Sequence, residues 1–189
     1  MGRLRRFVAP LAIAATLVVG IAALAIPQAL ADPFPGTNDG RRADGTTHVY
    51  CYHESVTIYG PLSYAMVNLD SQTDMTRSYS STCYSSTDVV WIEGDLAGTL
   101  RGSRGCVKAI SSTICDSSEL TLDYAQIDVG SDDDEDRKKT ACHELGHSVG
   151  LGHHDTSSDC MRNGAVPSTA LQYRQYRDHV VTSHINPNY

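Results

Sequence analysis

Residues 143–155 read HELGHSVGLGHHD, with histidines at positions 143, 147, 153 and 154. Residues four apart share one face of a helix, so His143 and His147 can present imidazole nitrogens to one metal ion about 2.0–2.1 Å away. Gly150 permits the positive φ that ends a helix, and the reversed chain can then return His153 to the same ion. Three histidine ligands leave a fourth position open, which is typical of catalytic zinc.

Glu144 directly follows the first of these histidines and is expected to lie beside the metal. A carboxylate there can act as a general base toward water and pass the proton to a leaving amine. At this chain's composition, the extended spacing with Gly150 and His153 arises by chance about once in thirty thousand shuffled sequences. The alternative, a surface helix with incidental histidines, is therefore the weaker interpretation.

The stretch HELGHSVGLGHH, followed by Met161, resembles the metzincin clan of zinc endopeptidases, and LGHSVGLGH is similar to the matrixin branch. The match is closest over residues 139–162. The resemblance implies Zn²⁺ bound by three histidines, a glutamate general base and a methionine in a tight turn beneath the metal. These roles carry onto His143, His147, His153, Glu144 and Met161.

The same resemblance implies an α+β fold: a twisted, mostly parallel sheet, a zinc-binding active-site helix, a Met-turn and a C-terminal helix. It also implies a polypeptide substrate that adds as an extra strand to a sheet edge, which we expect somewhere in residues 88–130.

Two positions depart from the family pattern. His154, after the third ligand, matches no known subfamily residue, and Asn163 stands where some families have a tyrosine two residues after the methionine. His154 stays open as an alternative third ligand, although its offset from His147 is less favourable. Asp155 and Asp159 either orient the ligands or solvate the loop.

The chain begins with an arginine-rich segment and a long apolar run that ends in Ala29-Leu30-Ala31, which predicts a signal peptide over residues 1–31. An uncleaved membrane anchor is the alternative. Cleavage takes the basic residues from 15 to 12 against 22 acidic ones, and the net charge from −7 to −10. We therefore expect a secreted chain with no nucleic-acid partner and no stable membrane association.

Beyond the signal we expect a flexible leader at residues 32–46 and one catalytic domain at residues 47–189. Within the domain, patterning predicts strands at 47–53, 88–96, 105–110 and 121–130, and helices at 61–75 and 168–184. The acidic run at residues 131–136 is interpreted as the first turn of the zinc helix, with a calcium loop as the alternative.

The six cysteines of an exported chain suggest three disulfides, which sequence alone allows to pair in 15 ways. Cys142 and Cys160 flank two segments that must meet if the metal site forms, so we predict that they are bonded. Either could instead pair elsewhere, or Cys142 could be a thiol ligand. Cys106 with Cys115 is a plausible hairpin link, which leaves Cys51 with Cys83.

Together these features predict a secreted, monomeric zinc endopeptidase. Two alternatives share the helix motif: a small neutral protease of the snapalysin type, which uses aspartate as third ligand, and a catalytically silent exported zinc-binding domain. A third is a folded surface protein whose histidines are incidental.

Overall fold

The computed structural model describes residues 41–153 and 158–189, which all belong to the second of two units into which the chain divides, residues 1–31 and 32–189. The predicted signal peptide and cleavage site lie outside the described residues, as do His154 and Asp155.

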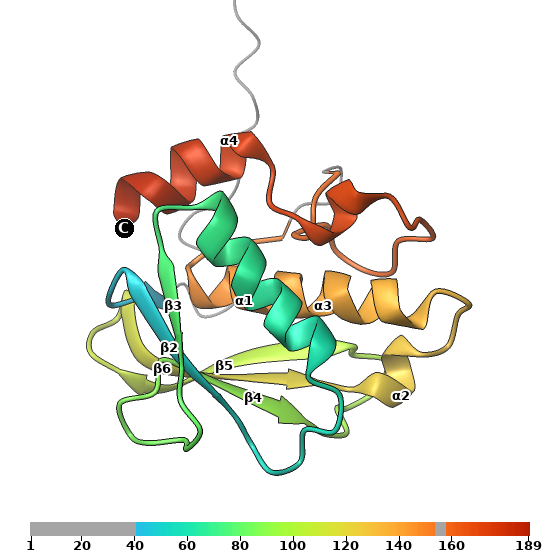
Figure 1. Ribbon diagram of the computed structural model, residues 1–189, viewed down its shortest axis with the longest axis horizontal. Helices are drawn as coiled ribbons and strands as arrows, with labels where there is room; N and C mark the ends of the chain where they lie inside the picture. Colours follow the sequence, from blue (N-terminus) through green and yellow to red (C-terminus); the bar gives the residue numbers. More distant parts are fainter. Residues whose placement is uncertain (1–40, 154–157) are drawn as a thin grey trace, which may run out of the picture. The chain divides into compact units, whose positions relative to one another are not determined.

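A six-stranded sheet forms the base of the described unit (Figure 1). Its strands are β1 (Arg42–Ala43), β2 (Thr47–Tyr52), β3 (Thr76–Tyr79), β4 (Val89–Glu93), β5 (Gly102–Ala109) and β6 (Ile114–Leu122). They lie in the order β1-β6-β4-β2-β3 with parallel pairing throughout, and β5 pairs antiparallel with β6. The expected α+β class with a mostly parallel sheet is confirmed.

Two helices, α1 (Gly60–Gln72) and α3 (Asp133–Ser148), lie together on one face of this sheet (Figure 1). Burial alternates along β4, which shows that one face of the sheet is covered: Val89 and Trp91 are fully buried, whereas Val90 and Ile92 are partly exposed. Pro61 occupies the first turn of α1, where its missing N–H costs nothing. The core therefore lies between the sheet and the pair of helices.

The acidic run before the motif begins α3, as predicted. Residues 133–136 are all acidic and all in its first turn, where negative charge interacts favourably with the helix dipole. The predicted flexible leader, residues 32–46, contains a short strand near its end: Arg42 and Ala43 pair with β6, and Ala43 is buried.

The predicted strand at 121–130 is wrong beyond Leu122. Asp123 ends β6 and starts the short helix α2 (Tyr124–Ile127), its side chain accepting a hydrogen bond of 3.1 Å from the backbone N–H of Gln126. This is an N-cap, which changes the backbone from extended to helical.

The single helix predicted at 168–184 is also wrong. That region contains η1 (Leu171–Arg174), α4 (Asp178–Val180), the π-helical η2 (Val181–Ile185) and η3 (Asn186–Asn188). The chain is extended at Gln175, where its carbonyl accepts from the Cys160 N–H at 3.0 Å. Pairing with the turn around Cys160 thus overrides the local helical pattern.

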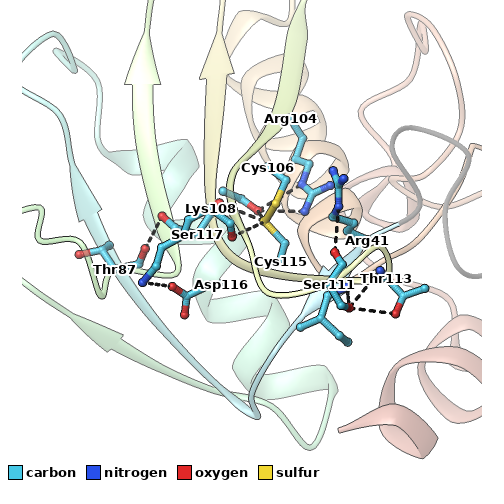
Figure 2. Close-up of a disulfide and its surroundings, with 12 residues drawn as sticks. Arg41, Thr87, Arg104, Cys106, Lys108, Ser111, Thr113, Cys115, Asp116 and Ser117 are labelled. Atoms are coloured by element: carbon cyan, nitrogen blue, oxygen red, sulfur yellow. Dashed lines mark hydrogen bonds and ion pairs between the residues drawn. A yellow bond between two sulfur atoms is a disulfide. The ribbon is translucent and has the colours of Figure 1, made fainter.

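All three predicted disulfides are present: Cys51–Cys83, Cys106–Cys115 and Cys142–Cys160. Figure 2 shows the second, which ties β5 to β6. Beside it, Lys108 of β5 forms an ion pair with Asp116 of β6. The disulfide links the edge strand β5 covalently to its neighbour. No helix in the described part of the chain is long and apolar enough to cross a membrane.

Candidate metal centre and its cleft

The three predicted histidines converge on one point. His143 and His147 project from α3, and Gly150, with φ of +94°, turns the chain so that His153 returns to them. Their candidate ligand nitrogens all lie within 4.8 Å of one another, and Nε2 of His147 is 3.0 Å from Nε2 of His153. These distances fit three ligands of one ion.

Hydrogen bonds determine which ring nitrogen of His143 and of His147 is free to bind a metal ion. Nδ1 of His143 lies 2.8 Å from the carbonyl of Cys160, and Nδ1 of His147 lies 2.7 Å from the carbonyl of Leu151. A carbonyl only accepts, so each Nδ1 carries the proton and each Nε2 keeps its lone pair. Metal-binding histidines are oriented in this way, so the residues fit a bound metal ion.

Burial keeps these rings neutral, as ligation requires. It lowers the pKa of His143 well below its ordinary value, with a smaller contribution from the Lys139 ammonium. It lowers the pKa of His147 to about 4, an effect that the hydrogen bond to Leu151 opposes.

Glu144 lies in the same cleft and is 5% exposed. Burial raises the pKa of its carboxyl to about 8, and the nearby Lys139 ammonium partly opposes this rise. The backbone of β5 approaches this side chain so closely that a β-carbon at Gly102 would stand 2.3 Å from Oε1 of Glu144. Glycine at this position therefore makes room for the carboxylate.

Met161, the methionine expected to lie beneath the metal, packs against Gly146 of α3. It is fully buried, and a β-carbon added at Gly146 would stand 2.2 Å from its sulfur. Asp159 shapes this turn: one carboxylate oxygen accepts from the Met161 N–H at 3.0 Å, and the other from Nε of Arg177 at 3.0 Å. The disulfide between Cys142 and Cys160 joins the same turn to the helix.

A cleft of about 560 Å³ runs along the histidines. Three segments line it besides the three histidines and Glu144: the loop and strand at residues 99–104, the helical residues Lys139 and Thr140, and the loop at residues 163–165. The cleft therefore joins the start of β5, the middle of α3 and the segment after Met161.

Sequence reasoning missed the part of this cleft that lies outside the motif. Arg101, Gly102 and Arg104 are some forty residues from the motif along the chain and carry no local pattern that marks them. Lys139 has a recognisable signal: it precedes His143 by four residues and so shares its helix face. Asp159, whose role was open, supports the Met161 turn, whereas the alternative ligand His154 lies outside the described residues.

A comparison with known protein families finds no family model that matches the chain, and a comparison with curated proteins finds no significant match.

Proposed function

We propose that this protein is a secreted zinc endopeptidase of the metzincin type. The observation that carries the proposal is the convergence of three imidazoles, two with Nδ1 held by carbonyls, in a cleft that also contains Glu144. A purely structural metal site has no need of a carboxyl group buried in the same cleft as its ligands.

Zn²⁺ held by His143, His147 and His153 would supply Lewis acidity, able to polarise a scissile carbonyl and to make water more acidic. A cation bound beside Glu144 would favour the ionised form of its carboxyl group, which would accept the proton of the attacking water and return it to the leaving amine. Gly102 leaves space for that carboxylate, and Met161 with the disulfide between Cys142 and Cys160 keeps the helix and the following turn together.

The strand β5 is the sheet edge on which a polypeptide would lie. Within the described residues it pairs on one side only, with β6, and its first residues line the cleft. An unpaired strand edge presents N–H and C=O groups that an extended peptide can bind. This supports a polypeptide substrate held across the metal centre.

The test uses the full chain expressed with its own N-terminal segment in an oxidising compartment. We expect about one zinc per chain by atomic absorption, and cleavage of casein or gelatin by the wild type. The variant Glu144→Ala should keep the zinc and lose cleavage by roughly 10²–10⁴-fold. Glu119→Ala, an exposed glutamate on β6, is the matched control and should behave as wild type.

Each alternative predicts a different result. Zinc without any cleavage indicates a silent metal-binding domain, and absence of stoichiometric zinc leaves the histidines incidental and defeats the proposal. Cleavage that survives Glu144→Ala does not come from this site. Retention of zinc after His153→Ala would contradict the ligand set.

A further inference from the structure

Lys139 is a buried cation in the wall of the cleft. It lies one helical turn before His143, is 8% exposed, and lines the cleft together with Thr140. Its Nζ donates to the carbonyl of Arg162 at 2.7 Å and to the carbonyl of Gly164 at 2.9 Å. The ammonium is therefore fixed between α3 and the loop after Met161.

This ammonium is only partly satisfied. It has three N–H donors, and the described residues provide acceptors for two of them, both neutral carbonyls. A buried charge is costly unless it is paired with an opposite charge. Burial lowers the pKa of this ammonium to about 8, even though the carboxyl groups of Glu144, Asp136 and Asp159 act on it in the opposite direction. The remaining N–H is thus available to an anionic group that enters the cleft.

The rest of the cleft also favours anions. Among the described residues, its lining contains the cations Arg101, Arg104 and Lys139 and one carboxyl group, that of Glu144. Arg101 is partly neutralised by Asp136, at 3.1 Å from it. This concentration of positive charge stands in a protein whose net charge is −7, so it is a local feature of the site.

The direction of a bound peptide follows from β5. Arg101 pairs with Asp136 near the start of α3, Gly102 lies against Glu144, and Arg104 acts electrostatically on His147 further along. The strand and the helix therefore pass the site in the same direction. A peptide that pairs antiparallel with β5, the more stable mode, runs from the His147 side toward the Lys139 side.

We infer that the cleft selects polypeptides with an acidic side chain on the residue directly after the scissile bond, whose carboxylate accepts the third N–H of Lys139. The inference rests on the proposed peptidase function. It assigns substrate choice to a residue of α3 that takes no part in metal binding.

The experiment measures cleavage of a peptide library by the wild type and by three variants. Lys139→Gln keeps amide donors for the two carbonyls but removes the charge, and Lys139→Arg keeps the charge. Lys108→Met is the control, a solvent-exposed lysine at the far end of β5. We expect a preference for Glu over Gln after the scissile bond of about tenfold, lost in Lys139→Gln and kept in the other two.

A second measurement separates binding from turnover. In zinc-loaded Glu144→Gln, a Glu-containing peptide should bind about tenfold more tightly than its Gln counterpart, and adding Lys139→Gln should abolish the difference. Cleavage without an acidic preference, or with the preference before the scissile bond, overturns this inference alone. An acidic preference that is unchanged in Lys139→Gln would show that Lys139 does not cause it. Absence of all cleavage defeats the proposed function and this inference together.

Discussion

Glu144 lies against the backbone of Gly102. A β-carbon at Gly102 would stand 2.3 Å from Oε1 and 2.7 Å from Cδ of Glu144. A real β-carbon cannot approach a carboxylate so closely, so Gly102→Ala must displace the Glu144 side chain. Displacement by about 1 Å should lower kcat/KM on the order of a hundredfold, with zinc content unchanged.

Gly105→Ala is the matched control for that substitution. It adds the same methyl group to the same strand, where no atom lies within 4 Å of the new carbon. Equal losses of activity in the two variants would show that the strand, and not the room for Glu144, is responsible.

A second prediction concerns Gly146 and Met161. Alanine favours a helix interior over glycine by about 1 kcal/mol, but here its β-carbon would stand 2.2 Å from the Met161 sulfur. Overpacking should prevail, so Gly146→Ala should destabilise the protein by roughly 1–3 kcal/mol in urea unfolding. Combined with Met161→Ala, which removes the nearest obstacle, its additional cost should fall to the smaller part that the Tyr176 ring, 3.2 Å away, still imposes; an undiminished cost would point to another cause.

The disulfide between Cys142 and Cys160 gives the third prediction. It closes a loop of 18 residues that contains His143, His147 and His153. Replacing both cysteines by alanine should cost roughly 3 kcal/mol of unfolding free energy by chain entropy and weaken zinc binding, because His143 donates to the Cys160 carbonyl. Zinc affinity is measured by competition with a chelator.

The pair Cys106 and Cys115 is the control for this experiment. It closes a loop of nine residues between β5 and β6. Its removal should cost a similar amount of stability, roughly 2.5 kcal/mol, without changing zinc affinity. Equal weakening of zinc binding in both double variants would contradict the supporting role of the first disulfide.

Local patterns explain which parts of the molecule could be predicted. The motif at residues 143–155 predicts two histidines on one helix face and a turn that brings a third back to them, and the structure brings the three histidines and Glu144 together in one cleft. The pattern predicts a strand that is too long, residues 121–130, because the alternation of side chains continues past Leu122, where β6 ends. The overlooked signal is Asp123 three residues before Gln126, a capping pattern that ends the strand.

Long-range contacts explain the rest. Residues around Tyr176 have helical spacing, yet the Tyr176 hydroxyl donates to the Cys142 carbonyl at 3.0 Å and the Gln175 carbonyl accepts from Cys160. These partners are distant along the chain, so no local pattern shows them. The same holds for Gly102, whose closeness to Glu144 depends on how β5 lies against α3.

The last prediction concerns acid sensitivity at His48, a residue of β2 that is 1% exposed. The Ser148 hydroxyl donates to the Leu145 carbonyl at 2.7 Å, so Nε2 of His48 must donate to Ser148 Oγ, 3.1 Å away. Nδ1 of His48 is buried without a hydrogen-bond partner among the described residues, and a protonated ring would leave that N–H unsatisfied. Burial, with a smaller contribution from Arg104, lowers its pKa from 6.5 to about 4.

The sign of the pH effect follows from that shift. Between pH 6.5 and 4 the unfolded chain binds the proton and the folded chain does not, so stability should fall as pH falls through this range. At pH 5 His48 alone should account for roughly 2 kcal/mol of that loss. The stability gap between wild type and His48→Gln, from urea unfolding with EDTA present, should therefore shrink by this amount from pH 7.5 to about pH 5. A constant gap for His48→Gln would show that His48 is not the sensitive group.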